Sequence, residues 1–406
     1  MRKKSKGPVF TSLEKKSIIG LSLILFFRMC GLFLVLPVFS VLALDLQHAT
    51  PFLIGLAFGS YALSQAILQI PFGVWSDKYG RKRLITIGLV LYAAGSIIAA
   101  LSDSIYWMIG ARLVQGSGAI SAAIFALIAD LTRPEVRTRA NAGLGASVGL
   151  SFAIAIFLAP FLGHWFGLHG IFWLTTALSL CGIICLHWLV PTPATIIHAT
   201  DHPRVKISLV LKNPSLQIIN WGAFVCGMGL SLMFFMVPLL LKQHGFLRED
   251  LWMVYLPMLI LGGLAMVPAA IVSEVKNRFR EVMLAGILIL MVSTVTLLIG
   301  WSHPGTGWFI ATLLIFFMGF NMFEPIFPSL VTRMTTPETK GTASGVYNFS
   351  QFIGHFSGAT LGGLLYQSHP YVLASMLLLV EGVFFLVMLR FANPDRAEVM
   401  ANEVPA

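Results

Sequence analysis

The stretch GVWSDKYGRKR, residues 73–83, separates two long apolar runs and decides how the rest of the chain is interpreted. Gly73 and the Tyr79–Gly80 pair are the places where the chain can reverse tightly, because glycine tolerates positive φ. Asp77 stands among four lysine and arginine residues. A carboxylate among cations at this place indicates either a solvated loop at a membrane face or a built charge cluster.

Composition places the chain among membrane proteins. Of its 406 residues, 57% are hydrophobic and 11% are charged, and the mean hydropathy is +0.84. Soluble proteins carry about a quarter charged residues. Crossing a bilayer takes roughly 20 apolar residues. The apolar runs therefore predict an all-α membrane protein with twelve transmembrane helices at about 17–44, 52–75, 84–102, 105–130, 141–165, 168–190, 214–241, 250–272, 281–300, 306–331, 342–366 and 370–391.

The net charge of +10 follows membrane topology. Most of the 27 lysine and arginine residues fall in the N-terminal tail and in alternate loops, whereas the opposite face has only Lys242 and Arg248. This positive-inside pattern predicts that both termini are cytoplasmic. The basic excess is thus explained by topology, and no nucleic-acid partner is expected.

Residues typical of enzymes and metal sites form no recognisable pattern. The ten histidines are scattered, and no Walker A sequence occurs. The cysteines show neither a disulfide framework nor metal spacing, because all four lie inside expected spans: Cys30, Cys181, Cys185 and Cys226. We expect neither an enzyme nor a bound cofactor or metal. The first span is too long for a cleaved signal and is expected to be retained.

The two halves of the chain resemble each other in their loops. Residues 134–137 with Ala140 match residues 337–340 with Ala343 at an offset of 203. At an offset of 197, Pro71, Ser76, Asp77, Arg81 and Arg83 match Pro268, Ser273, Glu274, Arg278 and Arg280. Two six-helix repeats are predicted, with an N-terminal bundle at 1–190, a cytoplasmic linker at 191–213 and a C-terminal bundle with a short tail at 214–406. In transporters, such repeats flank a binding site near the middle of the membrane.

The loop and helix motifs resemble those of the major facilitator superfamily over essentially all twelve spans. Residues 73–83 resemble its loop signature G-x-x-[SA]-D-[RK]-x-G-R-[RK]-[RK], and residues 112–118, RLVQGSG, resemble its fourth-helix motif R-x-x-Q-G-x-G. The fifth span is similar to the antiporter motif, with Ala159 in place of the usual glycine before Pro160. With residues 28–37, the motifs resemble the drug:proton antiporter branch, closest to YajR-type members. The C-terminal cytoplasmic domain that some of those members carry is not expected here.

Charged residues inside spans are candidates for function, because a charge at the bilayer centre costs at least ~2.5–3.5 kcal/mol. Arg28 lies about 17 Å from the cytoplasmic end of its span and Glu324 roughly 10 Å. We expect Glu324 to bind a proton or a cationic substrate, with a structural ion pair as the alternative; pairing with Arg28 stays open. The resemblance implies that Arg112 takes part in proton coupling, the alternative being an arginine bonded to neighbouring carbonyls.

The opening stretch has an expected partner at the end of the fourth span. The family pattern joins the aspartate and arginine of this loop to an acid at the position of Asp130. Physically, such a network would tie spans two and four to the N-terminus of span eleven near Thr342, whose dipole suits a carboxylate. We therefore predict a conformational latch of Gly73, Asp77, Gly80, Arg81 and Asp130.

The resemblance implies a secondary active transporter of the plasma membrane, the inner membrane in bacteria. We expect proton-driven efflux of small amphipathic or lipophilic compounds by alternating access, with the proton gradient as the energy source. The expected partners are a small-molecule substrate and the lipid bilayer, and the protein is expected to act as a monomer. An importer or facilitator of a sugar or other small metabolite is the alternative on the same fold.

Overall fold

The computed structural model describes residues 9–192, 207–247, 249–303, 305–336, 339–391 and 393. In this part the regular structure is helical, apart from an isolated bridge between Gln47 and Ser104. Ten helices are long and apolar enough to cross a membrane. One of them, α7, is divided at Gly167, whose φ is 65°, and α13 is also long but less apolar. With the two arms of α7 counted separately and α13 added, the described helices are consistent with the twelve expected spans.

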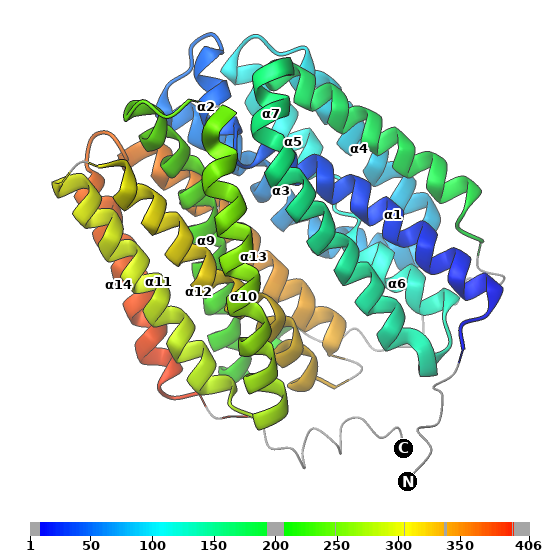
Figure 1. Ribbon diagram of the computed structural model, residues 1–406. Coiled ribbons are helices and arrows are strands. Elements are labelled where there is room, and N and C mark those ends of the chain that lie inside the picture. The colour runs from blue at the N-terminus through cyan, green and yellow to red at the C-terminus, as the bar shows by residue number, and fades with distance from the viewer. Residues whose placement is uncertain are drawn as a thin grey trace.

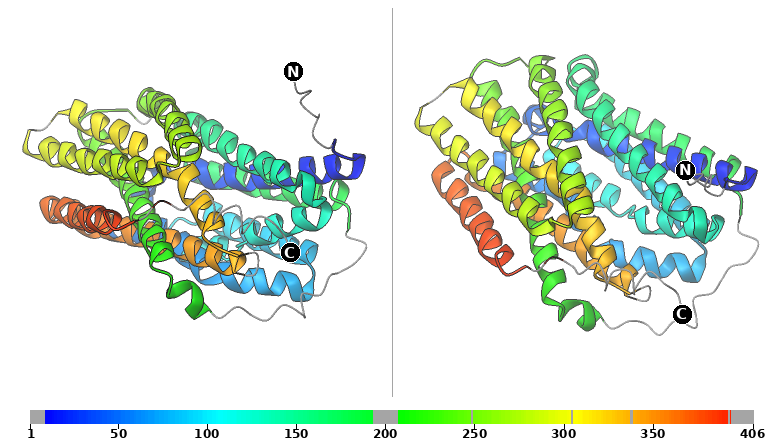
Figure 2. Two further views of the ribbon diagram at one scale, coloured as in Figure 1. Left: turned by 90° about the horizontal axis from the view of Figure 1, so that it is seen from below. Right: turned by 60° about the horizontal axis from the view of Figure 1, so that its bottom comes forward.

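The elements form two bundles, which lie side by side (Figures 1 and 2). The first comprises α1 (Ser12–Val35), α2 (Phe39–Leu42), η1 (Ala43–Asp45), α3 (Pro51–Tyr79), α4 (Arg81–Ala100), α5 (Ile105–Gly116), α6 (Ser121–Leu131) and α7 (Pro134–Trp188). The second comprises α9 (Pro214–Gln243), η2 (Glu249–Leu251), α10 (Trp252–Lys276), α11 (Phe279–Ser302), α12 (Thr306–Arg333), α13 (Lys340–Leu365) and α14 (Pro370–Met388).

The linker expected at 191–213 falls largely outside the described residues. Its described end includes the short helix α8 (Ile207–Leu211), which precedes α9.

Helix ends depart from the expected spans in two places near the site. The second span continues to Tyr79, so that Gly73 is helical and the reversal is made by Gly80 alone, with φ of 95°. The fourth span is interrupted between Gly116 and Ser121. A Cβ at position 116 would lie 2.1 Å from the carbonyl oxygen of Tyr61, so the missing side chain lets α5 approach α3 closely.

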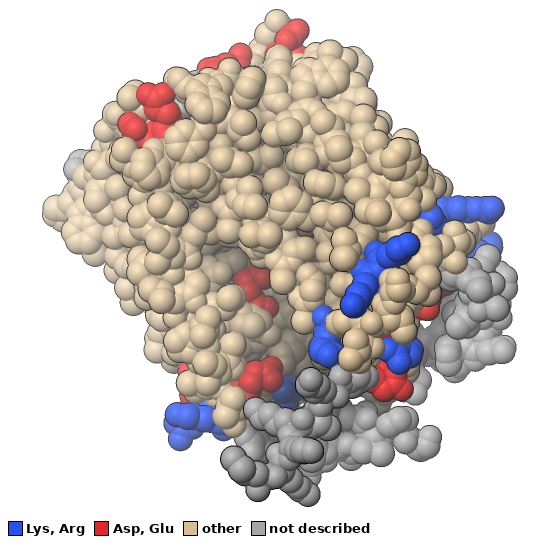
Figure 3. All heavy atoms as spheres, turned by 45° about the vertical axis from the view of Figure 1, so that its right-hand side comes forward, with Lys and Arg blue, Asp and Glu red and all other residues tan. Residues whose placement is uncertain are grey.

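The end of the molecule where α1 begins and α14 ends is called the cytoplasmic end below, following the positive-inside rule. It is the lower end in Figure 1. Lysine and arginine side chains gather toward this end on the face seen in Figure 3, which also has a hollow containing acidic atoms. The opposite end is called the outer end.

The two bundles contact each other closely toward the outer end. The Tyr255 hydroxyl of α10 donates a hydrogen bond to the Pro37 carbonyl at 2.9 Å, and Ser40 Oγ donates to the Phe234 carbonyl at 3.5 Å. A Cβ added at Gly55 of α3 would lie 2.4 Å from the Ala359 carbonyl of α13. These contacts close the interface between the bundles at its outer end.

Candidate functional site

Arg28 lies inside the first bundle and is 1% exposed. Its Nη2 donates to Tyr61 Oη at 3.2 Å, Gln65 Oε1 at 3.1 Å and the Gly118 carbonyl at 2.7 Å. Gly118 belongs to the interruption between α5 and α6, and its carbonyl accepts from both Arg28 and the Ile120 N–H. The side chain of Arg28 therefore holds α1, α3 and the broken fourth span together.

Arg112 of α5 occupies a second buried position close to the same tyrosine. Its Nη1 donates to Gln115 Oε1 at 2.5 Å, and Gln115 Nε2 donates to Ser96 Oγ at 2.8 Å. The guanidinium carbon lies 4.8 Å from the centre of the Tyr61 ring and 5.7 Å from that of Phe39. Both arginines are thus stabilised by Tyr61, one through its hydroxyl and the other through its π face.

Neither Arg28 nor Arg112 forms an ion pair with a carboxylate in the described part of the chain. Arg28 Nε and Nη1 and Arg112 Nε are buried without hydrogen-bond partners. Both arginines were expected from the sequence, but the polar side chains around them were not. Tyr61, Gln65 and Gln69 follow one another at four-residue spacing along α3, and this polar face of an apolar helix is the signal that could have revealed them.

Glu324 lies on the face of α12 that meets the first bundle. Seven residues nearer the outer end, Phe317 stacks on Phe152 of α7 with ring centres 6.3 Å apart. Residues seven apart share a helix face, so Glu324 follows Phe317 toward the cytoplasm by about 10 Å. Its side chain is exposed in the described structure. The carboxylate is therefore open on the face of α12 that is turned toward the first bundle.

Arg28 and Glu324 belong to different bundles and form no ion pair in the described structure. Arg28 bonds to groups of its own bundle. The pairing left open by the sequence is therefore not made in this state.

The five residues of the expected latch lie at the cytoplasmic end. Arg81 begins α4 directly after Gly80, because the positive φ of that glycine lets the chain reverse in one residue. Its Nη1 lies 3.3 Å from Asp77 Oδ1 of α3, and its Nε forms an ion pair with Asp130 of α6. Three helices thus meet at one guanidinium. Gly73 carries no charge contact, and a Cβ there would meet only Ala122, at 3.9 Å.

The second bundle contains a corresponding ion pair with a charge reversed. Glu274 of α10, the counterpart of Asp77, accepts from Ser329 Oγ at 2.6 Å and from Arg333 Nη2 at 2.5 Å. Arg333 of α12 stands 203 residues after Asp130 and is its counterpart. Because Arg333 supplies a cation where the first bundle has an acid, this pair forms directly between the two helices, without the arginine that follows the loop.

A further ion pair at this end was not expected from the sequence. Glu14 is 3% exposed, and its Oε1 accepts from Arg133 Nε at 2.9 Å. Thr11 and Glu14 also form a capping box at the start of α1, and Thr-x-x-Glu is the signal that the sequence offered. Hydrogen bonding to Glu14 raises the pKa of Arg133. The contact fixes α1 against the connection between α6 and α7.

Comparison with known proteins identifies the family of this two-bundle arrangement. The family model of the Major Facilitator Superfamily matches residues 21–359 and 252–403. The chain belongs to this superfamily. It is therefore a multi-pass membrane transporter rather than an enzyme, and its substrates are small molecules.

Individual superfamily relatives span nearly the whole chain. The inner membrane transport protein YajR of Escherichia coli K12 is 38% identical over 97% of this chain and 87% of its own length. The multidrug resistance protein MdtH of Aeromonas salmonicida is 25% identical over 83% of this chain and 84% of its own length. A solved D-xylose-proton symporter has a TM-score of 0.76 at 15% identity, covering 93% of this chain and 97% of its own. This last likeness concerns the fold alone.

Proposed function

We propose that the protein exports small amphipathic or lipophilic compounds in exchange for protons, by alternating access. The observation that carries the proposal is the exposed carboxylate of Glu324 between the two bundles. A carboxylate at this place can bind either a proton or a cationic substrate. Because the two cannot bind at the same time, the movement of one is coupled to the movement of the other. The relative MdtH, a multidrug resistance protein, supports export as the direction of transport.

The arginines of the first bundle have a supporting role in this proposal. Two positive charges inside the bundle favour the ionised form of a carboxylate that approaches them. When the bundles change their arrangement, Glu324 would change its distance from Arg112 and Arg28, and its affinity for the proton would differ between the two open states. Coupling requires such a difference in proton affinity between the two states. Because one polypeptide contains all of these groups, a monomer is sufficient for this mechanism.

The energy available from one proton is sufficient for efflux. A charge crossing ~150 mV releases about 3.5 kcal/mol. At 1.4 kcal/mol per tenfold change, this supports a concentration ratio on the order of 300-fold. A proton gradient across the membrane is thus an adequate energy source.

The ion pairs at the cytoplasmic end have a separate role in the proposal. Arg81 joins Asp77 to Asp130, and Glu274 joins Arg333 in the second bundle. We infer that each acts as a latch whose geometry differs between the two states, as expected for interfaces with discrete arrangements. In the present state, no described interaction connects Asp77 to Thr342 at the start of span eleven.

The test measures ethidium, a cationic amphipathic dye, in proteoliposomes after a pH jump. The purified protein should accumulate the dye against its gradient, and Glu324→Gln should reduce the accumulation ratio to about one because no proton is coupled. Glu281→Gln, which removes an exposed carboxylate at the cytoplasmic end of α11, is the matched control and should leave accumulation unchanged.

Undiminished pH-driven accumulation by the Glu324→Gln variant would exclude this residue from coupling. The importer alternative would replace the export proposal if the wild-type protein does not transport the dye but concentrates a sugar or another metabolite inside intact cells.

A further inference from the structure

His164 and Glu249 contact each other across the two bundles at the outer end, and the contact is an ion pair when the histidine is protonated. His164 is in the first arm of α7, and Glu249 is in η2 of the second bundle, directly before α10. His164 Nδ1 lies 3.0 Å from Glu249 Oε2. The two side chains are 50% and 43% exposed, so both are open to solvent and can exchange protons with it.

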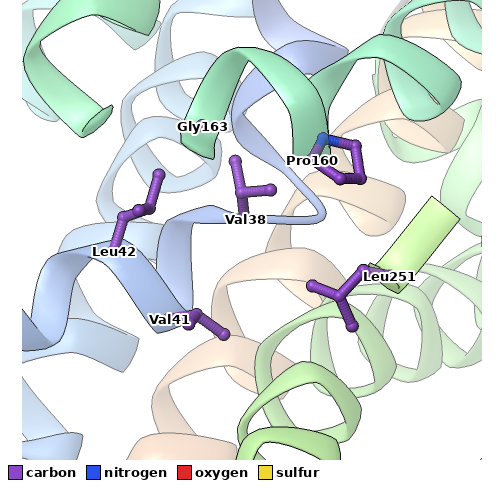
Figure 4. Close-up of a pocket in the computed structure, with 6 residues that line it drawn as sticks. All are labelled: Val38, Val41, Leu42, Pro160, Gly163 and Leu251. Carbon is purple, nitrogen blue, oxygen red and sulfur yellow. The ribbon is translucent and has the colours of Figure 1, made fainter. Parts of the chain in front are cut away.

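The ion pair adjoins the closed part of the interface. Figure 4 shows a narrow apolar pocket formed by three segments: the region that includes α2, the end of the first arm of α7, and η2. Gly163 and Leu251, which line it, are close sequence neighbours of His164 and Glu249; the other lining residues are Val38, Val41, Leu42 and Pro160. Nearby, Phe161 of α7 stacks on Trp252 of α10 with ring centres 6.2 Å apart. Opening the outer end would separate all of these contacts.

Helix ends favour a charged pair at these two positions. His164 lies three residues before Gly167, where the first arm of α7 ends. A helix C-terminus attracts a cation and a helix N-terminus attracts an anion. Glu249 precedes the first turn of α10, so both backbone dipoles stabilise the ionised pair in the positions that the side chains occupy.

We propose that His164 and Glu249 form a proton-sensitive clasp that holds the outer end closed when the exterior is acidic. Histidine side chains gain charge near pH 6 to 7. A neutral ring can still donate one hydrogen bond, but it loses the attraction between opposite charges. Protonation of His164 therefore strengthens the contact between the bundles, and deprotonation weakens it.

The neighbouring charged groups support the same sign of response. Asp250 follows Glu249 in η2 and adds a second acid to that segment. The helices α1, α2, α4, α6 and α10, which also pack against α7, contribute no Asp, Glu, Lys, Arg or His at the outer end. Beyond the clasp, Asp45 and His169 line a separate cavity of about 320 Å³. Arg248, the neighbour of Glu249 in sequence, lies outside the described residues.

Such a clasp would regulate transport without taking part in coupling. His164, the group that would sense the pH, faces the outer solution, whereas Glu324 lies deeper, between the bundles. A strongly acidic exterior would hold the outer end closed and limit proton entry at the moment when the driving force is greatest. The clasp acts on conformation only, so its effect does not depend on the substrate or on the direction of transport.

The test measures the population of the outer-closed state by the distance between two spin labels. Labels at Tyr106→Cys in the first bundle and Ser302→Cys in the second, both exposed near the outer end, report the separation in protein whose native cysteines are replaced. Lowering the pH from 8 to 5.5 should raise the ratio of closed to open molecules about 1.4- to fivefold, the range for an exposed ion pair.

Substitutions at position 164 separate the clasp from other effects of pH. His164→Gln should remove the increase, and His164→Arg, a permanent cation, should keep the closed population high at pH 8 as well. His169→Gln, at the other histidine near this end of α7, is the matched control and should respond like the unmodified protein. An unchanged pH response in His164→Gln would overturn the proposal, as would loss of the response in His169→Gln alone.

Discussion

Adding one methyl group at Gly55 is expected to open the outer end of the protein. The added Cβ would lie 2.4 Å from the Ala359 carbonyl oxygen, 2.9 Å from Gly363 Cα and 3.0 Å from Gly363 N. All three are backbone atoms of α13, so no side chain can rotate away. Since non-bonded carbon atoms prefer separations of about 3.5–4.0 Å, α3 and α13 must part by roughly 1 Å.

The magnitude follows from the cost of overpacking, about 1–3 kcal/mol. Because α3 and α13 belong to different bundles, this cost falls on the outer-closed state and is relieved when the outer ends separate. At 1.4 kcal/mol per tenfold change, the ratio of open to closed molecules should rise roughly 5- to 150-fold in Gly55→Ala.

Thiol labelling measures this ratio. Ser40 is fully buried at the outer interface, so Ser40→Cys, in protein without its native cysteines, should react with a membrane-impermeant maleimide only in open molecules. Gly110→Ala in α5 is the control, because a Cβ at Gly110 meets no atom within 4 Å. Equal labelling rates in folded Gly55→Ala and Gly110→Ala would refute the steric argument.

Two further predictions concern the charged side chains. Asp77→Asn breaks the cluster around Arg81, and Glu274→Gln breaks the corresponding pair with Arg333. Each variant should lower the turnover rate more than the substrate affinity. An equal loss of turnover and affinity in transport kinetics would count against a latch. Arg28→Lys should lower the Tm of the purified protein, because the lysine side chain is one bond shorter and its ammonium stops short of the Nη2 position that bonds Tyr61, Gln65 and Gly118. Each lost charged hydrogen bond costs about 1.5–3 kcal/mol. An unchanged Tm would show that those bonds add no stability.

Much of the architecture could be predicted from local sequence because the bilayer imposes strong local rules. Apolar length indicates a span, and loop charge indicates its orientation. Residues 73–83 indicated the reversal after the second span, although helix α3 continues to Tyr79 and Gly80 alone makes the turn. The copy at residues 273–280 indicated the repeat.

The surroundings of the candidate site could not be predicted in this way, since they arise from contacts between distant segments. Arg28 was identified as a buried charge, but its bonds to Tyr61 and Gly118 span 33 and 90 residues. Glu274 was matched to Asp77, yet its partner, Arg333, depends on how α10 packs against α12.

The sequence by itself determined that this is a two-bundle membrane transporter with charges inside its spans, because apolar length, loop charge and repeated motifs are properties of short segments. Only the tertiary structure decided which of those charges solvent reaches and which end of the interface is closed. Glu324 is exposed while Arg28 is buried, and the His164–Glu249 pair joins two bundles across 85 residues of chain. Both results depend on how the two bundles pack against each other. That packing is determined by many contacts between distant segments, so no short stretch of sequence predicts it.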